Sequence, residues 1–124
     1  MKTNEIVESN VLIVDDEPDI CFLLGGLLRQ RHLKTFFANN LTEAEASLHD
    51  HLPFLMFLDN RLPDGFGLDF IPFIKKNYPG TKVIMMTAHD SISDRRRAFE
   101  EGVDFFLSKP LSKELINVAL NTVA

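Results

Sequence analysis

Short apolar runs alternate along the chain with longer stretches in which apolar and polar positions recur at helical spacing. The runs have the length of strands, and the third and fourth are apolar on both faces, as in the centre of a parallel sheet. This alternation predicts β-α units and a three-layer α/β sandwich. The predicted strands are Val11–Asp15, Lys34–Ala38, Leu55–Asp59, Lys82–Thr87 and Asp104–Ser108.

The stretches between the runs predict amphipathic helices. The first is expected over Pro18–Arg31, with Glu17 close to its positive N-terminus, where a carboxylate is favourable. The second, Leu41–Asp50, opens with Thr42 and Glu45 at the spacing of a capping box. A kinked or late-starting helix is predicted over Leu68–Asn77, because Pro72 lacks a helical N–H, and further helices are predicted after Ser91 and after Ser112.

Size and charge narrow the class of protein. The 124 residues fit one domain, and the 45% hydrophobic and 25% charged residues are those of a globular protein. A net charge of −5 argues against direct binding of nucleic acid, which needs a basic surface. Residues 1–10 are polar and resemble neither a signal peptide nor a membrane anchor. We therefore expect a cytoplasmic protein without membrane contact, with an N-terminal extension over residues 1–10 and one domain over residues 11–124.

Polar side chains close four of the five predicted strands. They are Asp15 and Asp16, Asp59, Thr87 with the backbone N–H of Ala88 after it, and Lys109. Because the carboxyl ends of parallel strands meet at one edge of an open sheet, these residues are expected at one site. Three carboxylates about 4–6 Å apart repel by roughly 1–4 kcal/mol per pair, and a hard cation such as Mg²⁺ removes that conflict.

Each of these residues also has a structural explanation when it is taken alone. Asp15 or Asp16 is placed to cap the helix that begins near Pro18. Thr87 alone is an ordinary hydroxyl at a strand end, and Lys109 alone is an ordinary solvated lysine. Their joint occurrence at the ends of successive strands favours a functional site.

The complete pattern resembles the receiver domain of bacterial two-component response regulators. The resemblance runs from Val11 to about Val123 and rests on Asp15-Asp16, Asp59 with Pro63 and Gly67 after it, Thr87-Ala88 and Lys109-Pro110. It implies the flavodoxin-like, doubly wound (βα)5 fold, with five parallel strands in the order 2-1-3-4-5.

The resemblance also implies an acceptor and a metal site. Asp59 would take a phosphoryl group from the phosphohistidine of a histidine kinase or a phosphotransfer protein, and would form an aspartyl phosphate. Mg²⁺, with Mn²⁺ as a substitute, would be bound by Asp16, Asp59 and the backbone carbonyl of Arg61, while Asp15 would act through water.

Further residues are expected to bind the phosphoryl group and to transmit its arrival. Lys109, the Thr87 hydroxyl and the backbone N–H of Ala88 would donate to phosphoryl oxygens. In the family, the hydroxyl at the Thr87 position swings toward the phosphate, and an aromatic residue on the last strand turns inward. Here that residue is Phe106, for which simple core packing is the alternative.

Two other groups of residues are expected to modulate this activity. Arg61 and His89, two residues beyond Asp59 and Thr87, would flank the hydrolytic water and tune the lifetime of the acyl phosphate. The basic run 95–97 lies on the predicted fourth helix. One or two of its arginines are expected to pair in a homodimer through the face of the fourth helix, last strand and last helix.

Three other functions compete with a phosphorylation-dependent switch. A phosphohydrolase with an aspartyl nucleophile usually has a second aspartate where Arg61 stands. A flavin-binding protein needs a phosphate loop where Asp15, Asp16 and Glu17 would repel phosphate. A degenerate receiver that acts as a scaffold would not need the full acceptor set. We therefore expect a signalling switch, not an enzyme with turnover.

Overall fold

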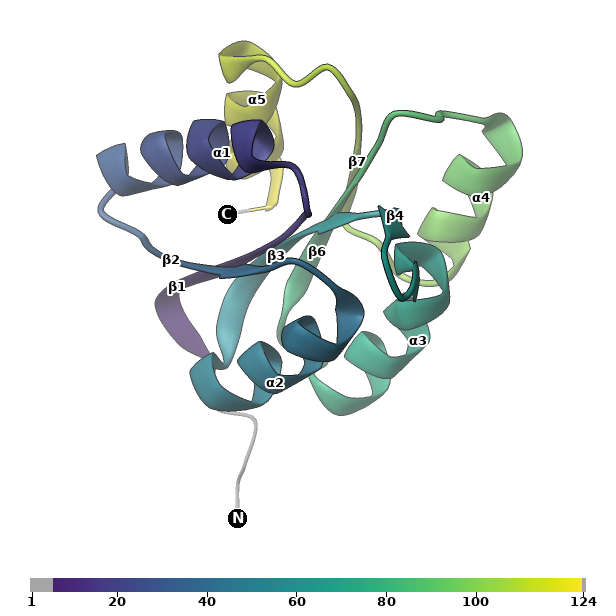
Figure 1. Ribbon diagram of the computed structural model, residues 1–124, viewed down its shortest axis with the longest axis horizontal. Helices are drawn as coiled ribbons and strands as arrows, with labels where there is room; N and C mark the ends of the chain where they lie inside the picture. Colours follow the sequence, from purple (N-terminus) through teal and green to yellow (C-terminus); the bar gives the residue numbers. More distant parts are fainter. Residues whose placement is uncertain (1–5, 124) are drawn as a thin grey trace.

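The computed structural model describes residues 6–123 and has three layers, with a sheet between two layers of helices (Figure 1). Five parallel strands are arranged in the order β2-β1-β3-β6-β7. This is the predicted order, because β4 (Arg61–Leu62) and β5 (Gly65–Phe66) form a separate two-stranded hairpin. The sheet strands are β1 (Val7–Val14), β2 (Lys34–Ala38), β3 (Pro53–Asp59), β6 (Lys82–Thr87) and β7 (Phe105–Ser108).

The first strand begins earlier than the sequence predicts. β1 starts at Val7, and Val7 pairs with Pro53 of β3. Asn10 pairs with Lys34 and donates its side-chain N–H to the carbonyl of His51 at 2.8 Å. Residues 7–9 are exposed, which is why no apolar pattern marks this segment. Residues 7–10 therefore belong to the sheet and not to an extension, and residues 1–5 of the predicted extension lie outside the described residues.

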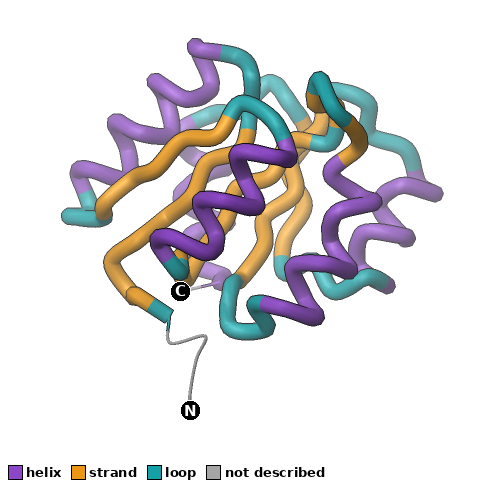
Figure 2. Tube along the Cα trace, turned by 60° about the horizontal axis from the view of Figure 1, so that its bottom comes forward, coloured by secondary structure: helices purple, strands orange, loops and turns teal. Residues whose placement is uncertain are grey.

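Helices cover both faces of the sheet (Figures 1 and 2). On one face lie α1 (Pro18–Gln30) and α5 (Lys113–Val123). On the other face lie α2 (Leu41–His51), α3 (Gly67–Asn77) and α4 (Ile92–Glu100). In the part of the chain that the structure describes, none of these helices has the length and apolar character of a membrane span.

The central strand β3 divides the apolar residues between two cores. Successive side chains of a strand point to opposite faces. Leu55 and Phe57 accordingly pack with α1 and α5, whereas Met56 and Leu58 pack with α2 and α3. All four side chains are fully buried, which confirms the prediction of a central strand. Asp59 is the last residue of this strand and lies at its carboxyl end.

The N-terminus of α2 is capped by a residue from a distant loop. The capping box predicted at Thr42 is wrong, because Asn40 caps the helix by accepting from the Glu43 N–H at 2.8 Å. Asp64 accepts from the N–H of Leu41 at 2.8 Å and from the N–H and hydroxyl of Thr42, both at 3.0 Å. This residue lies between β4 and β5, so it joins the loop after β3 to α2.

Candidate functional site

The carboxyl ends of four strands meet at one edge of the sheet, where Figure 2 shows the loops of its upper end gathered. A pocket of about 290 Å³ opens there. It is lined by Asp16, Glu17, Asp59, Arg61, Thr87, Ala88, His89 and Lys109. The parallel topology therefore brings together the predicted acceptor, phosphate-binding and lifetime-tuning residues, with Asp15 buried beneath them.

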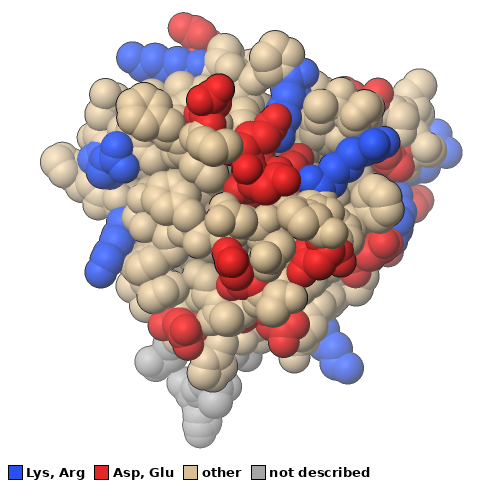
Figure 3. All heavy atoms as spheres, viewed as in Figure 1, with Lys and Arg blue, Asp and Glu red and all other residues tan. Residues whose placement is uncertain are grey.

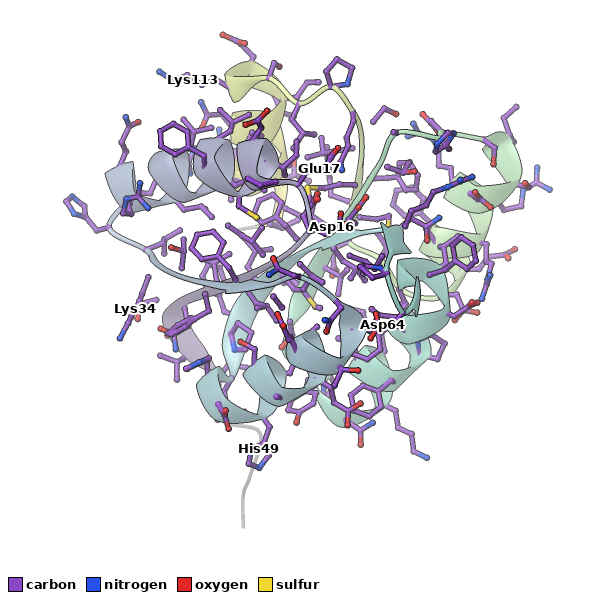
Figure 4. All side chains as sticks on the ribbon, in the orientation of Figure 1. Asp16, Glu17, Lys34, His49, Asp64 and Lys113 are labelled. Carbon is purple, nitrogen blue, oxygen red and sulfur yellow. The ribbon has the colours of Figure 1, made fainter. Side chains whose placement is uncertain are left out.

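Three carboxylates form the acidic part of this site. Oxygens of Asp15, Asp16 and Asp59 all lie within 4.8 Å of one another. Asp15 is fully buried and Asp59 is 5% exposed, whereas Asp16 faces solvent. Figure 3 shows acidic side chains gathered at the centre of one face, and Figure 4 labels Asp16 and Glu17 in that place, on the loop between β1 and α1.

The oxygens of Asp15 favour a bound cation. Oδ1 accepts from the N–H of Glu17 at 2.9 Å. Oδ2 is buried and has no hydrogen-bond partner within residues 6–123, although it lies 3.0 Å from the Nζ of Lys109. A buried carboxylate oxygen that lacks a directed donor and faces two further carboxylates fits a hard, oxygen-seeking cation such as Mg²⁺ or an ordered water.

Lys109 supplies the positive charge of the site. Its Nζ lies 2.7 Å from Oε2 of Glu17, 3.0 Å from Oδ2 of Asp15 and 3.3 Å from Oδ1 of Asp59. The lysine side chain is only 10% exposed. Its backbone N–H donates to the carbonyl of Thr87 at 2.8 Å, which joins the end of β7 to the end of β6. The alternative of a solvated lysine is therefore wrong.

Burial and mutual charge shift the pKa values of these groups. Burial and, after it, the charge of Asp15 raise the pKa of Asp59, and although Lys109 opposes both effects the pKa is about 6. Burial also raises the pKa of Asp15. Burial lowers the pKa of Lys109, but the contacts with Glu17, Asp15 and Asp59 outweigh this and hold it above its ordinary value. Lys109 therefore stays protonated beside two carboxyl groups whose pKa values are raised.

Thr87 ends β6 beneath the exposed turn that carries Ala88 and His89. Its side chain is buried, and Oγ1 accepts from the N–H of His89 at 3.0 Å. The hydroxyl is thus engaged with its own turn. Ala88 and His89 line the pocket from the exposed side.

The loop after Asp59 is held tightly against the sheet. Asn60 accepts from the N–H of Gly67 at 2.7 Å through its carbonyl, and from the N–H of Leu68 at 3.0 Å through Oδ1. A Cβ on Gly67 would lie 2.4 Å from the carbonyl oxygen of Asp59, so only glycine permits this close approach. The short hairpin enclosed in this way begins with Arg61 at the pocket.

The sequence and the fold have counterparts among known proteins. A family model described as the response regulator receiver domain matches residues 11–121. The chain belongs to the receiver domains of response regulators. It is 42% identical over 113 residues to the response regulator protein PilR of Pseudomonas aeruginosa, and the match covers 88% of this chain and 25% of PilR.

Other relatives give the same family. The transcriptional regulatory protein TcrX of Mycobacterium tuberculosis is 32% identical over 91% of this chain and 48% of its own length. The receiver thus spans between a quarter and a half of these two curated relatives. The beryllofluoride-activated NtrC4 receiver domain dimer superposes with a TM-score of 0.87 at 35% identity, covering 93% of this chain and 95% of that one.

Phe106 of this receiver is already buried. It is 7% exposed, and it lines a small internal space together with Thr87. The guanidinium carbon of Arg95 lies 4.6 Å from the centre of its ring. Arg95 also donates to Asp90, and the same Asp90 oxygen accepts from the hydroxyl of Ser108. The turn after β6, α4 and the end of β7 are thus joined around the predicted switch residue.

The other arginines of the basic run are arranged differently. Arg97 pairs with Asp69 of α3 at 2.7 Å, and Arg96 is exposed. Arg95 and Arg97 therefore have partners within their own chain, and Arg97 reaches α3 instead of the face expected for a dimer.

Sequence reasoning missed Glu17 as a site residue. Its carboxylate was expected at the N-terminus of α1, but Glu17 makes no side-chain cap there and reaches Lys109 instead. The two residues are 92 positions apart, and no local signal announces the contact. The acidic run from Asp15 to Glu17, opposite a strand-end lysine, was the only indication available.

Proposed function

We propose that Asp59 accepts a phosphoryl group from the phosphohistidine of a histidine kinase or a phosphotransfer protein in the cytoplasm. The observation that carries this proposal is the buried Lys109 ammonium, 3.3 Å from Asp59 and 3.0 Å from Asp15. One acceptor and one cationic group for the phosphoryl oxygens thus stand together at the floor of an open pocket. The phosphorylated domain then acts as a signalling switch.

The carboxylates are suited to hold Mg²⁺, or Mn²⁺ in its place. Asp16, Asp59 and the backbone carbonyl of Arg61 would ligate the ion, and Asp15 would act through water. When bound, the cation would neutralise the carboxylates and the incoming phosphate. The buried Oδ2 of Asp15, which has no hydrogen-bond partner within residues 6–123, and the clustering of the three carboxylates support this assignment.

The residues of the chain would position the phosphoryl group while a carboxylate oxygen of Asp59 attacks phosphorus. Lys109 would donate to one phosphoryl oxygen. The Thr87 hydroxyl and the Ala88 N–H would donate to others, since both lie at the pocket. These donors would stabilise charge that accumulates in the transition state.

The contacts of Thr87 suggest how phosphorylation of Asp59 would change the conformation of the output surface. Thr87 Oγ1 accepts from the N–H of His89, so its own O–H can donate to the phosphoryl group. Rotation of the Thr87 side chain toward that group would change the internal space that Thr87 and Phe106 line together. Arg61 and His89 are exposed at the pocket, where they would control access of the hydrolytic water and thus the lifetime of the acyl phosphate.

The face formed by α4, β7 and α5 is suited to association with a second copy of the chain. It carries exposed apolar residues, Ile92 and Phe99 on α4 and Leu115 and Val118 on α5. The activated NtrC4 receiver is a dimer. Val118→Asp should abolish phosphorylation-dependent association in sedimentation velocity, whereas Phe22→Asp, at an exposed position of α1, should preserve it. Equal association of both variants would contradict this role.

Intact-mass spectrometry tests the proposed function. The native chain and Asp59→Asn are incubated with acetyl phosphate, with Mg²⁺ and with EDTA. We expect one phosphoryl adduct on the native chain only, and only with Mg²⁺. An equal adduct on Asp59→Asn, or a folded native chain that accepts no phosphoryl group from this donor or from any kinase of a panel, would contradict the proposal.

A further inference from the structure

Lys109 makes its shortest contact with a carboxylate outside the predicted acceptor set. Its Nζ donates to Oε2 of Glu17 at 2.7 Å. The contacts with Asp15 and Asp59 are longer, at 3.0 and 3.3 Å, and Oδ2 of Asp15 receives no directed hydrogen bond within the described chain. The best-directed bond of the buried ammonium therefore goes to the rim of the pocket and not to its floor.

The backbone holds Glu17 in place for this contact. The N–H of Glu17 donates to Oδ1 of Asp15 at 2.9 Å, so the carboxylate at the floor fixes the residue at the rim. The side chain of Glu17 then returns to Lys109, which lies beside Oδ2 of the same Asp15. The three residues close a ring of contacts. Figure 4 shows Glu17 at the start of α1, on the side of the site nearest β7.

The three carboxylates around Lys109 differ in how easily they can be released. The side chain of Asp15 is fully buried and that of Asp59 is 8% exposed, whereas that of Glu17 is 56% exposed. A buried carboxylate that loses its partner is left without solvation, but an exposed one is solvated by water. Glu17 is therefore the partner that Lys109 can exchange at the lowest cost.

We propose that Glu17 is a positioning residue that holds Lys109 from the rim of the pocket and must release it when a phosphoryl oxygen arrives. This role rests on the proposed function of Asp59. An ammonium has three donors, and the donor now given to Glu17 is the one that becomes available to the phosphate. Glu17 thus restrains phosphoryl capture in the unphosphorylated domain.

The step is simplest with acetyl phosphate as donor. A carboxylate oxygen of Asp59 forms a bond to phosphorus, the bond from phosphorus to the acetyl oxygen breaks, and acetate leaves with the bonding electron pair. No proton is transferred, and the total charge is unchanged. Lys109 exchanges the Glu17 oxygen for a phosphoryl oxygen during this step, so the Glu17 contact is lost between the starting state and the transition state.

Three variants separate the contact from the charge of Glu17. Glu17→Gln weakens the ion pair and removes the charge, whereas Glu17→Asp keeps the charge but shortens the reach to Lys109. Asp19→Asn removes a nearby acidic charge of α1 that has no contact with Lys109 among the described residues. The rate constant of adduct formation with acetyl phosphate and Mg²⁺ is measured at about 0.15 M salt, where distant exposed charges are screened.

We expect Glu17→Gln and Glu17→Asp to raise this rate constant roughly 2- to 5-fold, and Asp19→Asn to leave it nearly unchanged. An unchanged or lower rate for Glu17→Gln overturns the proposal. So does a native rate for Glu17→Asp, or a rise for Asp19→Asn equal to that for Glu17→Gln, because either result would show an effect of charge alone.

A double-mutant cycle tests the contact without phosphorylation. In EDTA, Glu17→Gln should raise the equilibrium constant of unfolding roughly 2- to 5-fold in the native chain and have no effect beside Lys109→Met. An equal effect in both backgrounds overturns the contact. A native chain that takes no phosphoryl group contradicts the proposed function and removes the role of Glu17 with it, whereas a native chain that does so, with Glu17→Gln unchanged, contradicts this role alone.

Discussion

The Nζ of Lys109 lies 3.3 Å from Oδ1 of Asp59, although Lys109 follows β7 and Asp59 ends β3. β6 separates these two strands in the sheet, so the contact depends on the parallel order of all three. The lysine spans the pocket floor and compensates carboxylates that no other cation within residues 6–123 contacts.

Removing the ammonium should destabilise the domain. Lys109→Ala leaves Asp15 and Asp59 buried without a counter-charge, and breaking such a pair typically costs about 3–5 kcal/mol. Urea denaturation in EDTA should show a loss of this order, partly restored by Mg²⁺. Lys113→Ala, at an exposed position of α5, is the control and should have little effect. Equal stability of Lys109→Ala and the native chain would show that the lysine does not compensate the buried charge.

Neutralising the acceptor should have the opposite effect. Asp59 has a pKa of about 6 in the folded chain and an ordinary value of 3.8, so between these pH values the folded state binds more protons than the unfolded state. The stability of the native chain in EDTA should therefore fall as pH rises from 4 to 6 on account of this group. Above that range, Asp59→Asn should be more stable by about 2–3 kcal/mol.

Urea denaturation of the native chain and Asp59→Asn across this pH range measures the difference. The advantage of the variant should shrink as pH falls toward 4 and disappear below 3.8, where the aspartate is protonated in both states. Mg²⁺ should also reduce it at neutral pH, because the cation stabilises the native carboxylate. An advantage that is independent of both pH and Mg²⁺ would show that the ionised carboxylate of Asp59 does not destabilise the native chain.

Sequence reasoning succeeded where a feature was local. The run Leu55–Leu58 is fully buried in the centre of the sheet, and the side chains that end such runs had to meet at one edge. Residues 7–9 were not predicted as part of the first strand because their side chains are exposed, and an exposed strand segment has no apolar pattern. The elements and the acceptor pocket were thus predictable, but the true start of the sheet was not.

The missed residues make contacts over long distances in the sequence. Glu17 had a plausible local partner in the α1 N-terminus, and Lys109 provided a stronger one from the other end of the chain. Thr42 had the spacing of a cap, but Asn40 and the distant Asp64 satisfy the N–H groups of α2. Local rules cannot choose between a near and a distant partner when both are chemically suitable.

Asp64 should anchor the loop after the acceptor to α2. Hydrogen bonds from Leu41 and Thr42 lower the pKa of this exposed carboxylate, so its stabilising contribution is present above its ordinary pKa and is lost in acid. Asp64→Ala should lower the urea midpoint at neutral pH and accelerate hydrogen exchange at the N–H groups of Leu41 and Thr42. Glu45→Ala, on the exposed side of α2, should do neither. Similar exchange in the two variants would show that Asp64 does not cap the helix.

Thr87 should couple the phosphoryl group to Phe106. Thr87→Val keeps the shape of the side chain but removes the hydroxyl that now accepts from His89. The variant should still form an adduct, whereas phosphorylation should no longer shift the aromatic NMR signals of Phe106. The native chain serves as the reference for the size of the shift. An unaltered shift in Thr87→Val would mean that the signal reaches Phe106 without the hydroxyl.

The position of the phosphoryl group in the chain shows directly whether Asp59 is the acceptor. The native protein is treated with acetyl phosphate and Mg²⁺, reduced with borohydride, which converts an aspartyl phosphate to homoserine, and digested for tandem mass spectrometry. We predict homoserine at position 59 only, and none when EDTA replaces Mg²⁺. Homoserine at position 15 or 16 in place of 59, or an adduct that resists borohydride, would contradict the assignment of Asp59 as the acceptor.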